Sequence, residues 1–262
     1  MLAPRWVQPR LGAVLRRERV KRFYFNEFTN RGYVNGLRRA FVLATSPKLN
    51  EDAVSADPAG PQHGKHKAVV VFEGLRDYFK PLWDHAELVR EELLKIVSPR
   101  IVEEAFAERD PFVAMHIRRG DIISPGFTEQ QLLADRRYTP VSWYAAAATA
   151  INADPELRIL PIFVVSDGRE LELAELLKLP NCRFVTQGTA IGDILLLSKA
   201  WLLLASAHST FSMWASYLGR MPTLYFPGKM DQHVFPPGTG IFEGEWVPGQ
   251  RLPSANAETL KR

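Results

Sequence analysis

Apolar residues in the second half of the chain form short runs with amphipathic segments between them. The continuous apolar or β-branched runs predict buried strands at residues 112–117, 159–165, 182–185, 201–205 and 223–226. Between them, apolar spacings of three and four residues predict helices at residues 139–152, 169–178, 191–198 and 211–218. Strands that alternate with helices predict an open α/β sheet with right-handed crossovers and helices on both faces.

The remaining segments have weaker patterns. Residues 68–72 predict a short buried strand and residues 82–97 a helix, whereas residues 1–48 are basic and aromatic without a clear period. Residues 46–67 predict a loop or linker, and the Gly- and Pro-rich chain after Pro227 is expected to wrap the surface. Thr139 is expected to cap a helix that starts at Pro140, because its hydroxyl can accept from free backbone N–H groups.

The composition is that of a globular protein. The 262 residues are 46% hydrophobic and 24% charged, which suffices for a sizeable core. The most apolar stretch, residues 191–207, contains Asp193 and Lys199 and therefore predicts a buried helix and strand, not a membrane span. With no apolar signal core at the N-terminus, we expect a cytoplasmic protein, with peripheral membrane association as an option. Cys182 is the single cysteine and is interpreted as a structural thiol.

Charge is distributed unevenly along the chain. Residues 1–50 hold eleven Arg and Lys against two Glu, while the rest is net acidic and the total is +4. A basic segment suits an anionic partner such as nucleic acid or a membrane surface. The arginines of residues 16–22 are interpreted instead as a solvated helix face, and nucleic-acid binding by residues 1–40 is the least favoured hypothesis.

The first candidate site is the segment His116-Ile117-Arg118-Arg119-Gly120-Asp121. Two arginines that leave the end of a strand can bind a diphosphate through bidentate hydrogen bonds. Gly120 allows a sharp turn, and Asp121 beside two guanidinium groups can orient one of them. An exposed strand end with charge pairs is the alternative. Ligands of open parallel sheets bind at the carboxyl ends of strands, which favours the site.

The second candidate site is residues 207–214, where small hydroxyl residues stand between a strand and a helix. The free N–H groups and partial positive charge of a helix N-terminus suit a phosphate group. Ser209 and Thr210 can add hydroxyl donors, and His208 and Phe211 flank them. A plain helix cap by Ser209 is the alternative.

Two weaker candidates follow other predicted strands. Asp167 can accept hydrogen bonds from a base or a ribose, or can cap a helix. Residues 72–79, with Glu73, suit a lip that faces a ligand. No metal site is predicted, because the six histidines are scattered and no Asp-x-Asp triplet occurs. The P-loop motif and the Gly-x-Ser-x-Gly elbow are also missing from the sequence.

Taken in order, these segments resemble the alpha-1,2-fucosyltransferase family and its wider fucosyltransferase superfamily. Residues 116–121 are similar to the family's His-x-Arg-Arg-Gly-Asp motif, and residues 163–167 to its strand that ends in Ser-Asp. Residues 207–215 are similar to its Asn-Ser-Thr-Phe-Ser-Trp-Trp motif, although His208 replaces the usual Asn. Residues 73–79 and 140–144 match the family's Glu-Gly-Tyr-Phe segment and the helix start after the arginine motif.

The resemblance implies a GT-B-like α/β fold with a Rossmann-type C-terminal nucleotide-binding domain. That domain would occupy residues 109–262, and residues 1–108 would form a short or incomplete N-terminal lobe on the acceptor side. It further implies that fucose is transferred from GDP-fucose to a sugar hydroxyl with inversion, without a metal or any cofactor besides the donor. The family's Gly-Gly-Leu-Gly-Asn-Gln loop has no counterpart here.

The resemblance also implies roles for single residues. Arg118 would be the lead phosphate ligand, and Arg119 would hold local structure or bind the second phosphate. The other expected contacts are the β-phosphate for Ser209 and Thr210, the guanine or ribose for Asp167, and the pocket wall for His116 and Asp121.

The general base stays open, because such a base must reach the acceptor hydroxyl. Asp121, Glu73 and Asp77 are the candidates. Two alternative functions also stay open: a transferase that uses another nucleotide sugar, and a non-catalytic protein that binds a nucleotide sugar or a glycan. A donor panel and a turnover assay would separate them.

Overall fold

The computed structural model describes residues 27–29, 34, 36–50, 68–71, 77–108, 110–120, 122 and 126–253. The chain divides into two compact units, Met1–Tyr78 and Phe79–Arg262. The boundary expected at residues 108 and 109 thus falls inside the second unit, and the assignment of donor and acceptor lobes stays a prediction. Among the described residues, no helix combines the length and apolar character needed to cross a membrane.

The first unit contains a helix and a small parallel sheet. Helix α2 (Gly36–Thr45) buries none of its residues. Strand β1 (Lys48–Asn50) pairs in parallel with β2 (Val69–Val71), with Lys48 opposite Val69. Strand β2 matches the strand predicted at residues 68–72, but only Val69 is buried. Helix α2 and strand β1 lie in segments for which the pattern predicted no element.

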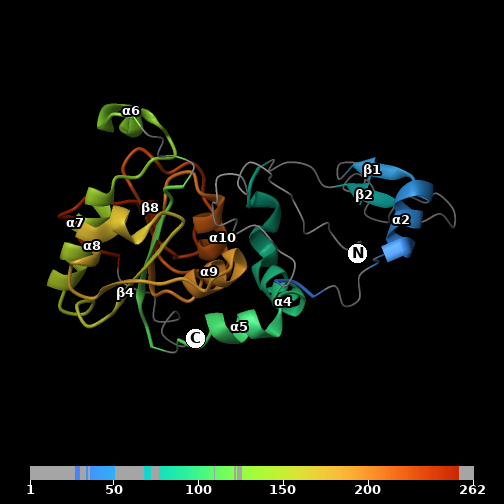
Figure 1. Ribbon diagram of the computed structural model, residues 1–262, viewed down its shortest axis with the longest axis horizontal. Helices are drawn as coiled ribbons and strands as arrows, with labels where there is room; N and C mark the ends of the chain where they lie inside the picture. The colour runs from blue at the N-terminus through green and yellow to red at the C-terminus, as the bar shows by residue number, and fades with distance from the viewer. Residues whose placement is uncertain are drawn as a thin grey trace. The chain divides into compact units, whose positions relative to one another are not determined.

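The second unit is built on a six-stranded parallel sheet (Figure 1). Its strands are β3 (Val113–Ile117), β4 (Ile162–Ser166), β5 (Cys182–Phe184), β6 (Leu202–Leu204), β7 (Thr223–Tyr225) and β8 (Glu243–Glu245). They are ordered β5-β4-β3-β6-β7-β8, and every neighbouring pair is parallel. The chain therefore winds outward from β3 to one edge, then starts again beside β3 at β6. This is the strand order of the doubly wound Rossmann fold, so the predicted α/β class is confirmed.

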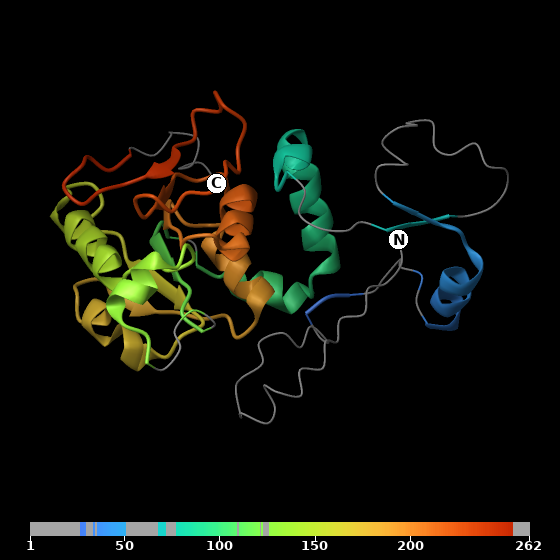
Figure 2. The ribbon, with the colours of Figure 1, turned by 90° about the horizontal axis from the view of Figure 1, so that it is seen from above.

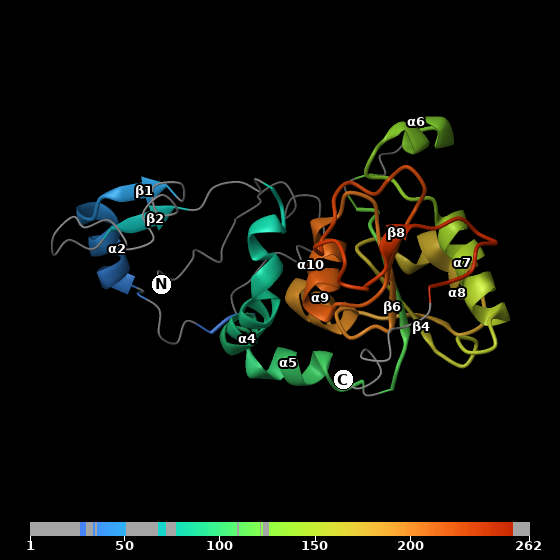
Figure 3. The same cartoon turned by 180° about the vertical axis from the view of Figure 1, so that it is seen from behind.

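Helices cover both faces of this sheet. Helices α7 (Val141–Ala153) and α8 (Ala174–Leu177) lie on one face, and α9 (Ala190–Leu197) and α10 (Thr210–Gly219) on the other (Figures 1 and 3). Helix α4 (Ala86–Ile96) packs beside α10, and α5 (Pro99–Ala105) against α9 (Figure 2). The other helical segments are η1 (Lys80–His85), α6 (Glu129–Ala134) and η2 (Glu170–Leu173).

Strand β3 lies at the centre of the core because both of its faces are covered. Successive side chains of a strand point to opposite faces. Accordingly, Val113, Met115 and Ile117 pack into the cluster that contains α7, while Phe112 and Ala114 pack into the cluster that contains α9. All five residues of β3 are buried, including the polar His116. Burial on both faces explains why β3 reads as a continuous apolar run.

Cys182 packs against the cluster around α7 as a half-buried free thiol. Burial raises the pKa of this thiol to about 11, so it stays protonated near neutral pH. A protonated thiol is a poor nucleophile, and this agrees with the structural role expected for Cys182.

One local prediction, the cap by Thr139, was wrong, and a second, the helix at residues 169–178, was right in position but only partly α-helical. Pro140 is the N-terminal cap residue of α7, and no side chain caps that helix. The hydroxyl of Thr139 instead accepts a hydrogen bond from the backbone N–H of Ala207, 3.0 Å away, and Thr139 is buried. The helix predicted at residues 169–178 is a 3-10 turn, η2, followed by the single turn of α8. Thr139 does not cap α7 because its hydroxyl is taken by the backbone N–H of Ala207, which is distant in the sequence.

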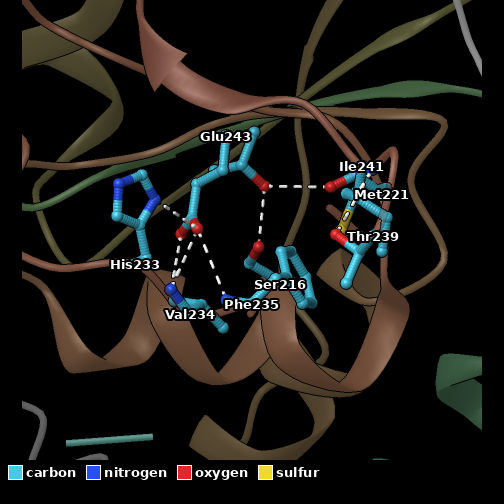
Figure 4. A network of polar contacts seen from close by, with 9 residues as sticks. Ser216, Met221, His233, Val234, Phe235, Thr239, Ile241 and Glu243 are labelled. Carbon is cyan, nitrogen blue, oxygen red and sulfur yellow. Dashed lines mark hydrogen bonds and ion pairs between the residues drawn. The ribbon is translucent and has the colours of Figure 1, made fainter. Parts of the chain in front are cut away.

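The chain after Pro227 was expected to wrap the surface, but part of it enters the sheet and the core. Strand β8 pairs with β7 and extends the sheet, and Val234, Phe235 and Trp246 are buried. Figure 4 shows how a polar strand is held there: the Glu243 carboxylate accepts from the backbone N–H of Val234 at 2.9 Å and of Phe235 at 3.4 Å. His233 Nδ1 lies 3.4 Å from the same carboxylate. Strand β8 is thus held by hydrogen bonds, whereas the other strands are held mainly by burial of their apolar side chains.

Candidate functional site

The candidate site lies where the sheet changes winding direction, between β3 and β6. These strands are neighbours, with Met115 opposite Leu204, so the residues that follow both strands share one edge of the sheet. The connections that leave them run to opposite faces, through α7 and through α10. In open α/β sheets, ligands bind in the crevice at this switch point. Residues 118–120 and 207–210, which the sequence placed in such a crevice, follow β3 and β6 at this edge, and the crevice itself stays a prediction.

Buried hydroxyl groups tie the ends of β3 and β6 together. Ser206 Oγ donates to the carbonyl oxygen of His116 at 2.7 Å and accepts from the Arg118 N–H at 2.8 Å. Tyr144 OH, from α7, donates to the same carbonyl at 2.9 Å and lies 3.1 Å from Ser206 Oγ. Burial raises the pKa of Tyr144 far above its ordinary value, so the phenol remains a donor. The backbone of Arg118 is thus fixed by β6 and α7.

His116 braces the first turn of α10. Its Nδ1 lies 2.7 Å from Ser212 Oγ, and its ring stacks on Phe211 with centroids 4.7 Å apart. Ser212 Oγ also accepts from the Ser206 N–H at 3.2 Å. The structure therefore brings together two predicted site residues, His116 and Phe211, and Ser212 adds a contact for which the sequence predicted no individual role.

The N-terminus of α10 faces this edge with backbone donors. Ser209 is its cap residue, and the Ser209 Oγ accepts from the Ser212 N–H at 3.5 Å. The backbone N–H groups of Thr210 and Phe211 have no acceptor among the described residues. Ser209 is buried, whereas Thr210 is exposed. Ser209 therefore acts as a cap, and Thr210 is the hydroxyl residue that is accessible to a ligand.

Asp167 supports the turn after β3. Its Oδ1 accepts from the backbone N–H of Arg119 at 2.7 Å and of Gly120 at 3.1 Å. A Cβ on Gly120 would lie 2.9 Å from Asp167 Oδ2, so the close approach requires glycine. Asp167 thus positions the arginine turn, a role the prediction did not assign, and its contact to a guanine or ribose stays a prediction.

The guanidinium of Arg119 is incompletely satisfied. Its Nε and Nη1 are buried and have no hydrogen-bond partner among the described residues, and its Cζ lies 5.9 Å from the centre of the Tyr138 ring. Buried polar groups are paired in the great majority of cases, and a charged one is costly to leave unpaired. The planar guanidinium donates in pairs to phosphate or carboxylate oxygens. An anion is therefore the expected partner of Arg119.

His208 is held at the turn between β6 and α10. Its backbone is left-handed, with φ of 45°, and its Nδ1 lies 3.1 Å from Asp231 Oδ2. Asp231 Oδ1 is in turn 3.5 Å from Nη2 of Arg136. Asp231 was missed because it follows His208 by 23 residues, in a segment with no periodic pattern.

The roles of three further predicted residues stay predictions. Asp121 and Glu73 lie outside the described residues, so their roles stay predictions. Asp77, the third candidate base, belongs to the first unit and has a left-handed backbone, with φ of 58°.

Comparisons with known proteins give likenesses of fold only. No protein-family model matches the chain, and no curated protein shows significant similarity. Among solved structures, POFUT1 in complex with GDP-fucose is 18% identical, with a TM-score of 0.42 over 72% of this chain and 59% of that chain. The apo form of POFUT1 is 17% identical, with a TM-score of 0.45 over 74% and 59%. The chain thus spans about three-fifths of the POFUT1 chain.

Proposed function

We propose that this protein is a glycosyltransferase that binds a nucleoside-diphosphate sugar at the β3–β6 switch point. GDP-fucose is the proposed donor, and a sugar hydroxyl is the proposed acceptor. The reaction would be a single displacement with inversion at the anomeric carbon and would need no metal. The donor and the stereochemistry rest on the three ordered sequence motifs, whereas the diphosphate site rests on geometry.

One observation carries the proposal: two buried guanidinium nitrogens without a partner in the described part of the chain, and an open helix N-terminus, follow the two strands at the switch point. The Nε and Nη1 of Arg119 lack partners, and the N–H groups of Thr210 and Phe211 lack acceptors among the described residues. Both groups seek negatively charged oxygen. A diphosphate offers several such oxygens.

Arg118 is proposed as the lead phosphate ligand. Alternation along β3 places His116 on the side of α10, where it contacts Ser212, and Arg118 continues that alternation. Arg119 then faces the α7 side, as its contact with Tyr138 shows. The two guanidinium groups would bind the diphosphate from both sides of the sheet edge.

These donors would stabilise the leaving group. Breakage of the bond from fucose to the β-phosphate leaves added negative charge on GDP, and pre-placed donors meet it without reorganisation. Loss of one such donor typically costs about 3–4 kcal/mol, or roughly a hundred- to thousandfold in rate. The arginines and the dipole of α10 would thereby do the work that a metal ion does in other transferases.

Titration of GDP into the full chain by calorimetry, with and without EDTA, tests the site. We expect GDP to bind equally in both conditions and the Arg118→Ala variant to lose at least tenfold in affinity. Arg100→Ala is the matched control, because Arg100 is an exposed surface arginine paired only with Glu104 within the described residues. Failure of the folded protein to bind GDP would overturn the proposal. Tighter binding of another nucleotide would show that the donor is a sugar of that nucleotide and not GDP-fucose.

Turnover is tested separately from binding. The full chain is incubated with GDP-fucose and a panel of glycans, and release of GDP is measured. GDP release that depends on a glycan supports a transferase. Tight GDP binding without release in any condition would favour a non-catalytic nucleotide-sugar-binding protein.

A further inference from the structure

The turn that carries His208 holds its imidazole ring in a defined orientation. Position 208 directly precedes Ser209, the cap of α10, and its left-handed backbone is uncommon for a residue other than glycine. The side chain is only 15% exposed, so the ring is largely enclosed. A strained backbone and an enclosed ring at the switch point indicate that the orientation of His208 serves a function.

Asp231 fixes which ring nitrogen carries the proton. A carboxylate can only accept hydrogen bonds, so the neutral ring must carry its hydrogen on Nδ1, 3.1 Å from Asp231 Oδ2. The other nitrogen, Nε2, then presents a lone pair and has no hydrogen-bond partner among the described residues. Arg136, at 3.5 Å from Oδ1, holds the carboxylate from its other side. Carboxylate, imidazole and free lone pair form the arrangement of an oriented general base.

We propose that His208 Nε2 is the proton acceptor in the transfer reaction and that Asp231 is its positioning residue. This inference rests on the function proposed above, and it assigns the base that the sequence left open. The acceptor oxygen forms a bond to the anomeric carbon while its proton moves to Nε2. The bond from that carbon to the β-phosphate oxygen breaks, and its electron pair leaves with GDP. The imidazolium then returns the proton to solvent.

The position of His208 along the chain places it close to the expected β-phosphate site. The β-phosphate is expected at the N–H groups of Thr210 and Phe211, and the anomeric carbon is bonded to an oxygen of that phosphate. His208 lies only two residues before Thr210, on the same turn. The base and the leaving group would therefore be held by one short segment between β6 and α10.

A phosphate-binding role for His208 predicts different behaviour. The neutral ring points a lone pair from Nε2, which repels a phosphate oxygen, so only the imidazolium could bind phosphate. The charged group in contact with the ring is Asp231, and Arg136 lies next to that carboxylate. A base requires the neutral ring, whereas a phosphate ligand requires the protonated one, so the two roles have opposite dependence on pH.

The test compares His208→Gln and Asp231→Asn with the full-length protein. His233→Gln is the matched control, because His233 is also paired with a carboxylate, Glu243 at 3.4 Å, but at the edge strand β8. Calorimetry gives the affinity for GDP. Release of GDP from GDP-fucose, with water as the acceptor, gives the rate from pH 5 to pH 9. Thermal unfolding confirms that each variant is folded.

We expect His208→Gln to slow GDP release on the order of a hundredfold or more while its affinity for GDP stays within about twofold. The rise of the rate with pH that reflects loss of the imidazole proton disappears in this variant. Asp231→Asn keeps that rise but at a lower rate, because the ring is present and less well oriented. His233→Gln matches the wild type in both measurements.

Other outcomes overturn the inference. An unchanged rate in His208→Gln excludes a proton-accepting role, and a large loss of GDP affinity, strongest at low pH, identifies a phosphate ligand instead. Wild-type protein that binds GDP but releases none from GDP-fucose, with water or with any glycan of the panel as the acceptor, refutes the base while the nucleotide site stands. Wild-type protein that binds no GDP refutes the proposed function itself.

Discussion

At the scale of single residues, Arg119 has opposite effects on the empty and the occupied protein. Two of its guanidinium nitrogens are buried without a partner in the part of the chain that the structure describes. An unpaired buried donor typically costs about 1–3 kcal/mol, more when charged. The same nitrogens become favourable once an anionic ligand accepts from them. Stability and binding therefore respond in opposite directions to a change at this position.

Arg119→Met tests this opposition. Methionine keeps the length of the aliphatic stem but removes the unpaired donors, so the free energy of unfolding without ligand should rise by about 1 kcal/mol. The rise in melting temperature that we expect GDP to produce in the wild type should be lost. Urea unfolding and thermal scans with and without GDP measure both effects, and Arg100→Met serves as the surface control. A less stable empty variant would contradict this account.

Ser206 is the residue on which the hydroxyl contacts between β3 and β6 converge. Ser206→Ala removes an acceptor from the Arg118 N–H and a donor to the His116 carbonyl, so we expect a loss of about 2–3 kcal/mol in stability. Affinity for GDP should fall as well, because Arg118 is no longer held.

A second serine provides the control for Ser206. Ser216→Ala breaks another buried hydrogen bond of α10, 2.8 Å long, to Thr223. Urea unfolding should show both variants destabilised, whereas calorimetry should show weaker GDP binding in Ser206→Ala alone. Equal loss of GDP affinity in the two variants would assign Ser206 a purely structural role.

At the scale of elements, the ends of β3 and β4 interlock through two glycines. Asp167 caps the turn at Gly120, and a Cβ on Gly168 would lie 2.9 Å from the Cβ of Arg119. A Cβ cannot move without its backbone, so this contact leaves no room for a larger residue. The arginine turn is therefore shaped by the turn that follows the neighbouring strand.

Gly168→Ala should displace the arginine turn. Overpacking of this kind costs about 1–3 kcal/mol, and we expect GDP affinity to fall with it. Gly244→Ala is the control, because its Cβ would meet only the ring end of the exposed Phe242, at 3.2 Å. Urea unfolding should show that control within about 0.5 kcal/mol of the wild type. A wild-type affinity for GDP in Gly168→Ala would show that the arginines do not depend on this contact.

Strand β8 carries a buried carboxylate whose protonation is linked to folding. Burial raises the pKa of Glu243 above its ordinary value of 4.5, against the lowering effect of the Val234 and Phe235 N–H groups. The folded state thus binds a proton that the unfolded state releases. The free energy of unfolding should fall as the pH rises from 4.5 through the raised pKa.

Glu243→Gln should remove that part of the pH dependence. The amide oxygen can still accept from the Val234 N–H, so β8 should stay in the sheet. Urea unfolding from pH 4 to pH 8 gives the difference between variant and wild type, and that difference should grow in favour of the variant as the pH rises. A difference that does not change with pH would mean that Glu243 titrates normally.

At the scale of the whole molecule, the sequence predicted the strands whose residues are buried on both faces of the sheet. Strands β3, β4 and β6 are covered on both faces, so their apolar runs are plain, and the arginine and serine motifs follow them directly. Strand β8 was not predictable, because Glu243-Gly244-Glu245 is polar and is stabilised by pairing with β7. The partnership of Asp231 with His208 has no sequence spacing that could reveal it. Polar contacts between residues far apart in the sequence could not be predicted, because the apolar periodicity carries no information about them.

The segment from residue 227 to residue 242 has a consequence for changes in loop length. Lys229 Nζ donates to the carbonyl oxygens of Leu133 and Asp135, and Asp231 contacts His208, while Val234 binds Glu243 in the sheet. Surface loops usually tolerate insertions and deletions at exposed tips. Here the exposed Pro237 and Gly238 provide such a tip. One residue added between Asp231 and Val234 would instead draw the carboxylate away from the imidazole and leave the arginines and the sheet intact. An insertion or deletion there would therefore act like a substitution of His208 or Asp231 in the candidate site.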